Sequence, residues 1–242
     1  MHLHDLPQAD ATRIYAVGDV HGRLDLLLRL QAAIRADLDA RPTAAPLVCY
    51  LGDYVDRGPA SAGVIDHLAA PSQDGLRRIC LKGNHEDRML AFLDEPERNG
   101  PGWMKFGGRE ALASYGVRQA LVDAGDWARL RDALAAALPP GHLAFLRSLH
   151  LALRWGGYLF VHAGLDPARS LADQDPHDLM WIREPFLSSG RDWGVRVVHG
   201  HVIEPEPVFR PNRIGLDTGA YKSGVLTCAA LDGAVARVIQ AR

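Results

Sequence analysis

Gly52-Asp53-Tyr54-Val55-Asp56-Arg57-Gly58 follows directly on an aliphatic run over residues 47–51. Such a run predicts a buried strand, so the loop after it presents two carboxylates and a guanidinium. Four further motifs follow aliphatic runs in the same way: Gly18-Asp19-Val20-His21-Gly22, Gly83-Asn84-His85-Glu86, Val161-His162-Ala163-Gly164 and His199-Gly200-His201. Oxygen and imidazole groups delivered at the ends of strands suit two divalent cations. The ordered set therefore predicts a dinuclear metal centre.

The chain around these motifs has the pattern of an α/β protein. Its first part alternates strands with helices: strands over 14–17, 47–51 and 78–81, and helices over 24–38, from Pro59 and over 86–93. Residues from about 99 to 150 break this rhythm and predict a helical insertion within a single domain of residues 1–242. Its helical periods run over 109–115, 126–138 and 142–149.

Strands resume after the insertion, over 159–161, 195–198, 214–217, 225–230 and 235–239. The last two are predicted to form a hairpin, because Asp232-Gly233 is a favoured two-residue turn. The ends of the chain, through about residue 12 and after residue 239, are expected to be disordered.

Composition limits the class of protein. With 242 residues and 48% apolar content the chain can bury one core. A formal net charge of −2 gives no overall basic field, which argues against nucleic acid as the main partner. Cys49, Cys80 and Cys228 form no CxxC pair, so we expect free thiols in a reducing compartment. Neither a signal-peptide pattern nor a membrane helix of roughly 18 apolar residues is visible, and the prediction is a cytoplasmic protein with no membrane partner.

The residue types assign ligands to two metal ions. Asp19 and His21 lie two apart, so in an extended loop both side chains point the same way and supply a first metal. Asp53 has two carboxylate oxygens that can bridge both ions, and the second metal is completed by Asn84, His162 and His201. Two such cations lower the pKa of a bridging water and attract a phosphate. The alternative is a set of buried polar side chains satisfied by the backbone, which explains a lone residue better than an ordered set.

Two arginines and a histidine add groups that phosphoryl transfer needs. Arg57 in the second motif and Arg183 farther along the chain can each grip two phosphate oxygens. For each of them a surface ion pair is the alternative role. His85 is placed to protonate the leaving oxygen, and we expect Asp56 to orient its ring and raise its pKa.

The motifs in this order resemble the PPP-type serine/threonine protein phosphatases of the calcineurin-like metallophosphoesterase superfamily, above all their small bacterial members. The resemblance runs from about residue 14 to residue 230. It implies a four-layer fold in which two mixed β-sheets pack face to face with helices outside. It also implies two metal ions at one edge of the sandwich, most often Mn²⁺, with Fe or Zn²⁺ as alternatives.

The resemblance further implies a role for each matching residue. The metal ligands are Asp19, His21, Asp53, Asn84, His162 and His201. The substrate phosphate is bound by Arg57, Arg183 and Asn84, and the acid pair is His85 with Asp56. The implied reaction is one-step hydrolysis of a phosphorylated protein or small phosphoester, by in-line attack of metal-bound water.

The chain departs from its bacterial relatives at the rim of the site. Phe106 stands before Gly107-Gly108 where they often carry Asn, and Val202-Ile203 follows the last ligand where they often carry Thr-Pro. Tyr221 falls in a loop that the family places near the metals, either at the phosphate or as a packed aromatic. These differences concern the substrate and leave the metal ligands intact.

Three alternative functions are open at this point. A diadenosine tetraphosphate hydrolase would use the same metals, with Trp103, Lys105 and Arg109 as candidate substrate contacts. A nucleic-acid phosphodiesterase would carry a second histidine after His201, which is absent, and His199 lies on the wrong side of the glycine to replace it. A non-catalytic scaffold would have lost ligands, and none is lost.

Overall fold

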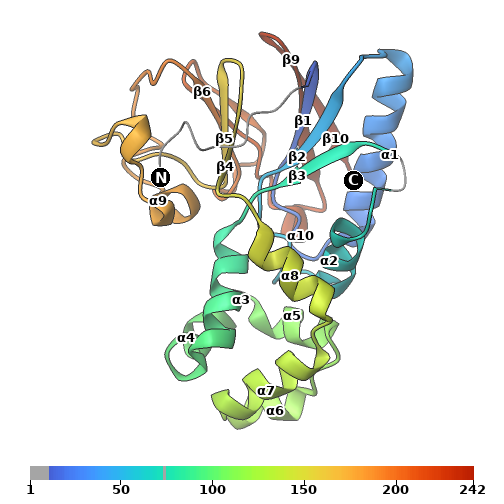
Figure 1. Cartoon of the computed structure of the whole chain (residues 1–242), viewed down its shortest axis with the longest axis vertical. Coiled ribbons are helices and arrows are strands. Elements are labelled where there is room, and N and C mark those ends of the chain that lie inside the picture. The colour runs from blue at the N-terminus through green and yellow to red at the C-terminus, as the bar shows by residue number, and fades with distance from the viewer. Residues whose placement is uncertain (1–10, 73–74) are drawn as a thin grey trace.

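The computed structural model describes residues 11–72 and 75–242, which form two five-stranded β-sheets packed face to face with helices outside (Figure 1). The first sheet has the strand order β10 (Val235–Ala241), β9 (Leu226–Asp232), β1 (Arg13–Val17), β2 (Pro46–Tyr50) and β3 (Arg77–Cys80). The second has the order β4 (Ala152–Trp155), β5 (Tyr158–Val161), β6 (Arg196–His199), β8 (Arg213–Gly215) and β7 (Val208–Phe209). In each sheet three parallel strands are joined by antiparallel ones, so both sheets are mixed, as predicted.

The helices occupy three places. Beside the first sheet lie α1 (Leu24–Ala40), α2 (Ser61–Ala69) and the short α10 (Ala220–Ser223), and beside the second lies α9 (Pro176–Trp181), which follows a 3₁₀ turn at Leu171–Asp173 (Figure 1). The remaining helices gather at one end of the sandwich: α3 (Asn84–Asp94), α4 (Pro96–Lys105), α5 (Gly108–Ser114), α6 (Gln119–Ala124), α7 (Trp127–Ala137) and α8 (Pro140–Ser148).

The alternation of side chains along the strands explains the layers. Ile14 and Ala16 of β1 pack in one apolar cluster with Phe160 of the second sheet. Tyr15 and Val17, which point the other way, pack in the cluster that contains the helices. Because both faces of β1 are covered, the strand is buried at every position and is apolar along most of its length.

The helical insertion contains two helices that the sequence did not predict. The periods over 109–115, 126–138 and 142–149 correspond to α5, α7 and α8, but α4 and α6 are additional. The sequence of α4 holds Pro101 between two glycines, which lowers its intrinsic helix propensity. Close packing against α7 favours the helix. The ring of Trp127 lies directly on Gly100, where a Cβ atom would be only 2.4 Å from it. Tertiary packing therefore outweighs local propensity here.

Three local expectations are wrong. The β9–β10 register pairs Asp232 with Val235, so the two-residue turn is Gly233-Ala234, one position later than predicted, with Gly233 at φ 58°. Strand β10 continues to Ala241, which removes the expected disorder after residue 239. Helix α3 begins at Asn84 instead of residue 86, which brings the third motif into its first turn.

The other expectation of terminal disorder falls mainly on residues 1–10, which lie outside the described part of the chain. Within that part, the backbone amide of Thr12 donates to the carbonyl of Ala45. All three cysteines are free thiols, as predicted, while the cytoplasmic location stays a prediction. Among the described residues no helix combines the length and apolar character needed to cross a membrane.

Candidate metal centre

The predicted ligands come together where strands of both sheets end. The amide of Gly200, after β6, donates to the carbonyl of His162, after β5, at 2.8 Å. The amide of His201 donates to the carboxylate of Asp19, after β1, at 3.0 Å. A Cβ atom at Gly200 would lie 2.0 Å from an oxygen of Asp19, so only glycine permits this approach between the sheets. Every predicted metal ligand is buried.

Glu86 connects the loop that contains Asp53 to the first turn of α3. Its carboxylate accepts four backbone N–H groups at 2.7–3.2 Å, from Gly83, Asp53, Tyr54 and Val55. Burial raises the pKa of Glu86 to about 7. The amide of His85, in the first turn of α3, donates to Oδ1 of Asp53 at 3.0 Å. The Asp53 carboxylate is thus held at a helix N-terminus, which favours its charged form.

Asp53 lies between two histidines. Its Oδ2 is 3.4 Å from Nε2 of His21, and its Oδ1 is 3.4 Å from Nε2 of His162. In each ring Nδ1 lies 2.9 Å from a backbone carbonyl, of Val55 and Leu51 respectively, so Nδ1 carries the proton. Each Nε2 then faces Asp53 and is the ring atom left to bind a metal, as in the tautomer that metal-ligating histidines adopt.

The second predicted ligand set is assembled around Asn84. Its Oδ1 lies 2.9 Å from Nε2 of His162 and 2.9 Å from Nδ1 of His201. Burial lowers the pKa of His201 to about 3. Burial alone would lower the pKa of His162 as well, but Asp53 and Asp19 raise it to about 10. A proton on His162 therefore occupies the place that a bound cation would take.

The first predicted set is assembled differently from expectation. Among the described residues, two groups of His, Cys, Asp or Glu side chains have ligand atoms within 4.8 Å of one another: His21, Asp53 and His85, and Asp53, His162 and His201. They share Asp53, the proposed bridging ligand, and the first contains His85 where the prediction has Asp19. Burial and the neighbouring carboxylate of Asp217 raise the pKa of Asp19 well above its usual range. These donors fit a pair of divalent cations, because buried oxygen and imidazole acceptors face one another.

Backbone strain is concentrated in the same loops. The described residues other than glycine with positive φ, between 44° and 71°, are His21, Asp53, Asp56, Arg57 and His201. The left-handed region is costly for such residues and persists only where surrounding contacts enforce it, typically at functional sites. The value of 44° at His21 also shows that the loop after Asp19 is not extended, so the predicted reason for their convergence is wrong.

The two residues of the predicted acid pair lie in contact, and a third side chain joins them. Nδ1 of His85 lies 2.6 Å from Oδ2 of Asp56, and the indole nitrogen of Trp103 donates to both Asp56 oxygens at 3.0 and 2.9 Å. Nε2 of His85 is buried without a hydrogen-bond partner. Burial lowers the pKa of His85 to about 4 and raises that of Asp56 well above its usual range. The expectation that Asp56 raises the pKa of His85 is therefore wrong, because burial has the larger effect.

The residues proposed as dinucleotide contacts do not line the centre. Trp103 is completely buried behind Asp56, which assigns it a positioning role instead. Lys105 is exposed, and Arg109 pairs with Asp123 at 2.8 Å on the surface of the insertion.

The two predicted phosphate-binding arginines lie at the edge of the centre. An N–H of Arg57 donates to Nε2 of His21 at 2.9 Å, and its guanidinium lies 4.9 Å from the ring centroid of Tyr221. Tyr221 also contacts His21, ring to ring, at 5.4 Å. Arg183, just after α9, is exposed, and its positive charge contributes to lowering the pKa of His201. Glu184 accepts hydrogen bonds from Ser188 instead of pairing with Arg183.

Arg88 also lies at this rim and was not predicted from the sequence. Its guanidinium carbon lies 4.0 Å from the ring centroid of Phe106 and 4.5 Å from that of Trp181. Because α3 begins at Asn84, Arg88 stands three residues after His85 on one helix, so their side chains share a face. Had the helix been predicted to begin at Asn84, its periodicity would have placed Arg88 on the same face as His85.

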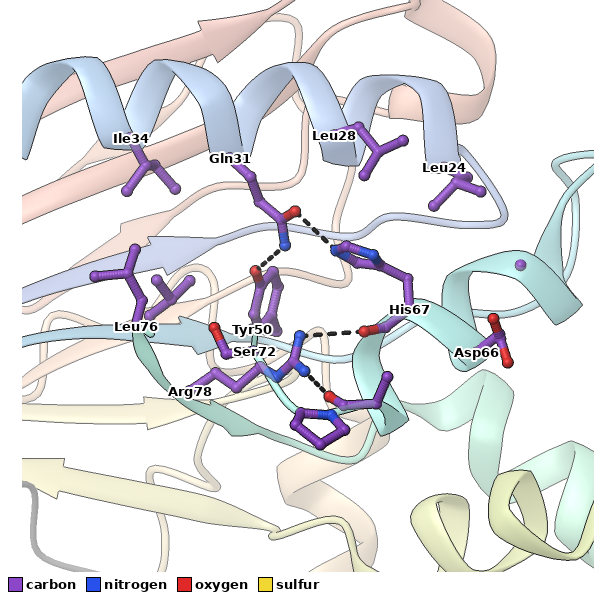
Figure 2. Close-up of a pocket in the computed structure, with 14 residues that line it drawn as sticks. Leu24, Leu28, Gln31, Ile34, Tyr50, Asp66, His67, Ser72, Leu76 and Arg78 are labelled. Carbon is purple, nitrogen blue, oxygen red and sulfur yellow. Dashed lines mark hydrogen bonds between the residues drawn. The ribbon is translucent and has the colours of Figure 1, made fainter. Parts of the chain in front are cut away.

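A separate cavity of about 440 Å³ lies between α1, α2 and the strands β2 and β3. Figure 2 shows Gln31 bridging the hydroxyl of Tyr50 and the ring of His67, and Arg78 reaching backbone carbonyls. No predicted site residue lines it. It plays no part in the metal centre.

Comparison with known proteins agrees with this geometry. A family model described as calcineurin-like phosphoesterase matches residues 12–222. The chain is 23% identical to an asymmetrical bis(5'-nucleosyl)-tetraphosphatase of Anoxybacillus flavithermus, over 87% of each chain. It is 27% identical to serine/threonine-protein phosphatase 1 of Salmonella typhimurium, over 89% of this chain and 90% of that one. A symmetrical bis(5'-nucleosyl)-tetraphosphatase of Ralstonia nicotianae is 30% identical over 74% of this chain, which spans 56% of that enzyme's length.

Solved structures with the same fold carry equally mixed descriptions. A putative diadenosine tetraphosphatase superimposes with a TM-score of 0.66 at 20% identity, covering 98% of both chains. A cold-active protein tyrosine phosphatase superimposes with a TM-score of 0.62 at 18% identity, covering 97% of this chain and 80% of that one. At these identities the likeness concerns the fold alone.

Proposed function

Because this chain belongs to the calcineurin-like phosphoesterase family, we propose that it hydrolyses phosphomonoesters at two divalent cations, with Mn²⁺ as the expected metal. The observation that supports this most strongly is the position of Asp53, whose two carboxylate oxygens each lie 3.4 Å from Nε2 of a different buried histidine. The proposed ligands are Asp19, His21, Asp53, Asn84, His162 and His201. Two bound cations would supply an ionised water as nucleophile and neutralise charge on the phosphate.

The remaining polar groups suit the rest of the reaction. Arg57 would exchange its bond with His21 for one to phosphate, because metal binding uses the lone pair that now accepts its N–H. Arg183, exposed at the rim, would contact the phosphate from the other sheet, and Asn84 would add a further contact. His85, with Asp56 on its Nδ1, would give a proton from Nε2 to the leaving oxygen.

For the substrate we propose phosphoserine and phosphothreonine in proteins. An alkoxide is a poor leaving group, so the reaction needs an acid, and the His85–Asp56 pair provides one. The likeness to the Salmonella serine/threonine phosphatase over nearly the whole of both chains supports the same choice.

A second candidate is hydrolysis of dinucleoside tetraphosphates. Its specific support is the cation of Arg88 between the rings of Phe106 and Trp181, next to the centre. The Anoxybacillus relative, which carries that activity in its name, also matches over most of both chains.

Phosphate release from a phosphothreonine peptide and from diadenosine tetraphosphate, each with excess Mn²⁺, tests the two candidates. We expect turnover of the peptide, and a loss of kcat of roughly 10²- to 10⁴-fold in His85→Asn, with bound metal unchanged. His150→Asn, which alters an exposed histidine, is the matched control. Turnover of the dinucleotide alone would establish the second candidate, and no turnover of either substrate with any divalent cation would refute two-metal hydrolysis.

A further inference from the structure

The guanidinium of Arg88 is held by aromatic rings and by no anion. It lies against the rings of Phe106 and Trp181, and its Nε is buried without a hydrogen-bond partner. Within residues 11–72 and 75–242, its side chain makes no hydrogen bond or ion pair. A Cβ atom at Gly102 would lie 3.1 Å from its Nη1, so the glycine of α4 leaves room for the group.

Asp56 and Asp87, the two carboxylates whose charge acts most on Arg88, already have other partners. Asp56 accepts from Trp103 and contacts His85, and Asp87 forms an ion pair with Lys82 at 2.8 Å. Burial lowers the pKa of Arg88, but a guanidinium stays protonated in proteins. Contact with two rings compensates in part for lost hydration, yet a half-buried cation without an anion retains capacity to bind one.

Arg88 lies beside the residue that would protonate the leaving oxygen. It stands one helical turn after His85, the proposed acid, and the ring of Phe106 contacts the ring of His85 at a centroid distance of 6.3 Å. Trp181, the other ring, stands two residues before Arg183. A group bonded to the scissile oxygen would therefore leave past Phe106 and meet this cation.

We propose that Arg88 is a subsite for a second phosphate group, linked through the scissile oxygen to the phosphate that is attacked. The two rings lie against the guanidinium and so fix its position, while its N–H edge suits two oxygens of one phosphate. A phosphate fits better than a peptide carboxylate, because Arg88 is only one helical turn from the acid, whereas an acidic side chain is several bonds from the scissile oxygen. Such a subsite would serve the second candidate substrate, a phosphoanhydride, as in nucleoside diphosphates and dinucleoside polyphosphates.

The step is an ordinary hydrolysis. A water oxygen forms a bond to the attacked phosphorus and gives up a proton to solvent, and the bond from that phosphorus to the bridging oxygen breaks. The electron pair stays on the bridging oxygen, which either takes the proton of His85 or leaves as an anion beside Arg88. The inference rests on the proposed phosphoester hydrolysis and favours its second substrate candidate.

The test is the ratio of kcat/KM for diadenosine tetraphosphate to kcat/KM for p-nitrophenyl phosphate, which has no second phosphate. In Arg88→Met we expect this ratio to fall roughly 10- to 100-fold, mostly through KM, as for loss of a charge-assisted hydrogen bond. Arg88→Lys, which keeps the charge but loses the planar fork, should give an intermediate ratio. Arg98→Met, which alters an exposed residue of α4 beside its partner Glu95, should leave the ratio unchanged.

Each other outcome has a defined meaning. An unchanged ratio in Arg88→Met, or equal losses on both substrates, would overturn the subsite. A loss confined to phosphopeptides with a neighbouring acidic residue would also overturn it, in favour of a peptide contact. Wild-type hydrolysis of p-nitrophenyl phosphate reports on the proposed function separately. If that activity is absent, calorimetry still tests the subsite, by titrating inorganic pyrophosphate into Mn²⁺-loaded wild type and Mn²⁺-loaded Arg88→Met. Weaker binding in the variant would support the subsite, and equal binding would overturn it.

Discussion

The carboxylate of Asp56 is central to the site at the scale of single residues. It is fully buried, contacts His85 on one side and accepts the indole N–H of Trp103 on the other. The Trp103 bond opposes the rise in pKa that burial causes in Asp56. We therefore expect Trp103 to position and tune the proposed acid pair from its buried place behind Asp56.

Trp103→Phe removes the donor and keeps most of the ring. The pKa of Asp56 should rise further, so the acidic limb of the pH profile of kcat should move to higher pH. The free energy of unfolding should fall by about 1–3 kcal/mol, because a buried acceptor loses its partner. The measurements are kcat between pH 5 and 9 and urea denaturation.

The matched control is Trp127→Phe, the same substitution on the neighbouring α7, where the ring packs on Gly100 of α4. Its indole nitrogen has no hydrogen bond to any other described residue, so stability should change slightly and the pH profile not at all. A shift of the acidic limb in both variants would show that packing, and not the hydrogen bond, is responsible.

At the scale of elements, Asp37 ties helix α1 to the edge of the first sheet. It accepts hydrogen bonds from Tyr15 of β1 at 2.8 Å, from Arg41 at 2.8 Å and from Arg237 of β10. These contacts, that with Arg237 above all, lower the pKa of Asp37 from 3.8 to about 2. The helix and two strands are therefore joined by one charged side chain.

The contribution of Asp37 to stability should depend on pH in a definite direction. A folded-state pKa below the unfolded value means that the charged form stabilises the fold above about pH 4, and that this is lost as the pH falls through 2. Asp37→Asn should therefore lower the free energy of unfolding by about 2 kcal/mol at pH 7 and by less at pH 3.

Urea denaturation at pH 7, 5 and 3 measures this difference. Asp39→Asn is the control on the same helix, since its side chain is 72% exposed and pairs with Arg35 only at 3.8 Å. An equal loss for Asp37→Asn at pH 7 and pH 3 would show that its effect is not one of charge.

At the scale of the whole molecule, the proposed ligands are divided between the two sheets. Asp19, Asp53 and Asn84 follow strands of the first sheet, and His162 and His201 follow strands of the second. Metal ions bound between them would join the sheets at this edge, so binding should stabilise the entire fold.

Removal and addition of metal should therefore shift thermal unfolding. Mn²⁺ at a hundred times its dissociation constant should add about 2.7 kcal/mol to the free energy of unfolding, and EDTA should reverse the gain. Calorimetry with metal analysis of the protein is the measurement. In Asp53→Asn, which keeps the size of the bridging side chain, the gain should be lost, and an equal gain in this variant would exclude Asp53 as a shared ligand.

The sequence alone determined which residues meet and in what kind of fold. Strands β1, β2 and β3 are parallel, so the groups after them gather at one edge, and this follows from apolar runs and the motifs behind them. Most helices follow from the same local patterns, whereas the two mixed sheets, confirmed here, were implied by the family resemblance that the motifs carry. The assignment of each residue as a ligand stays a prediction.

Only the tertiary structure decided how these groups are held. The bond of Trp103 to Asp56 joins residues 47 apart, and the rings around Arg88 come from α4–α5 and α9. The low pKa of His85 and the raised pKa of Asp19 are set by burial, which no local pattern encodes. Local sequence specifies periodicity and chemical type, whereas distances, burial and electrostatics depend on contacts between segments that are distant in the chain.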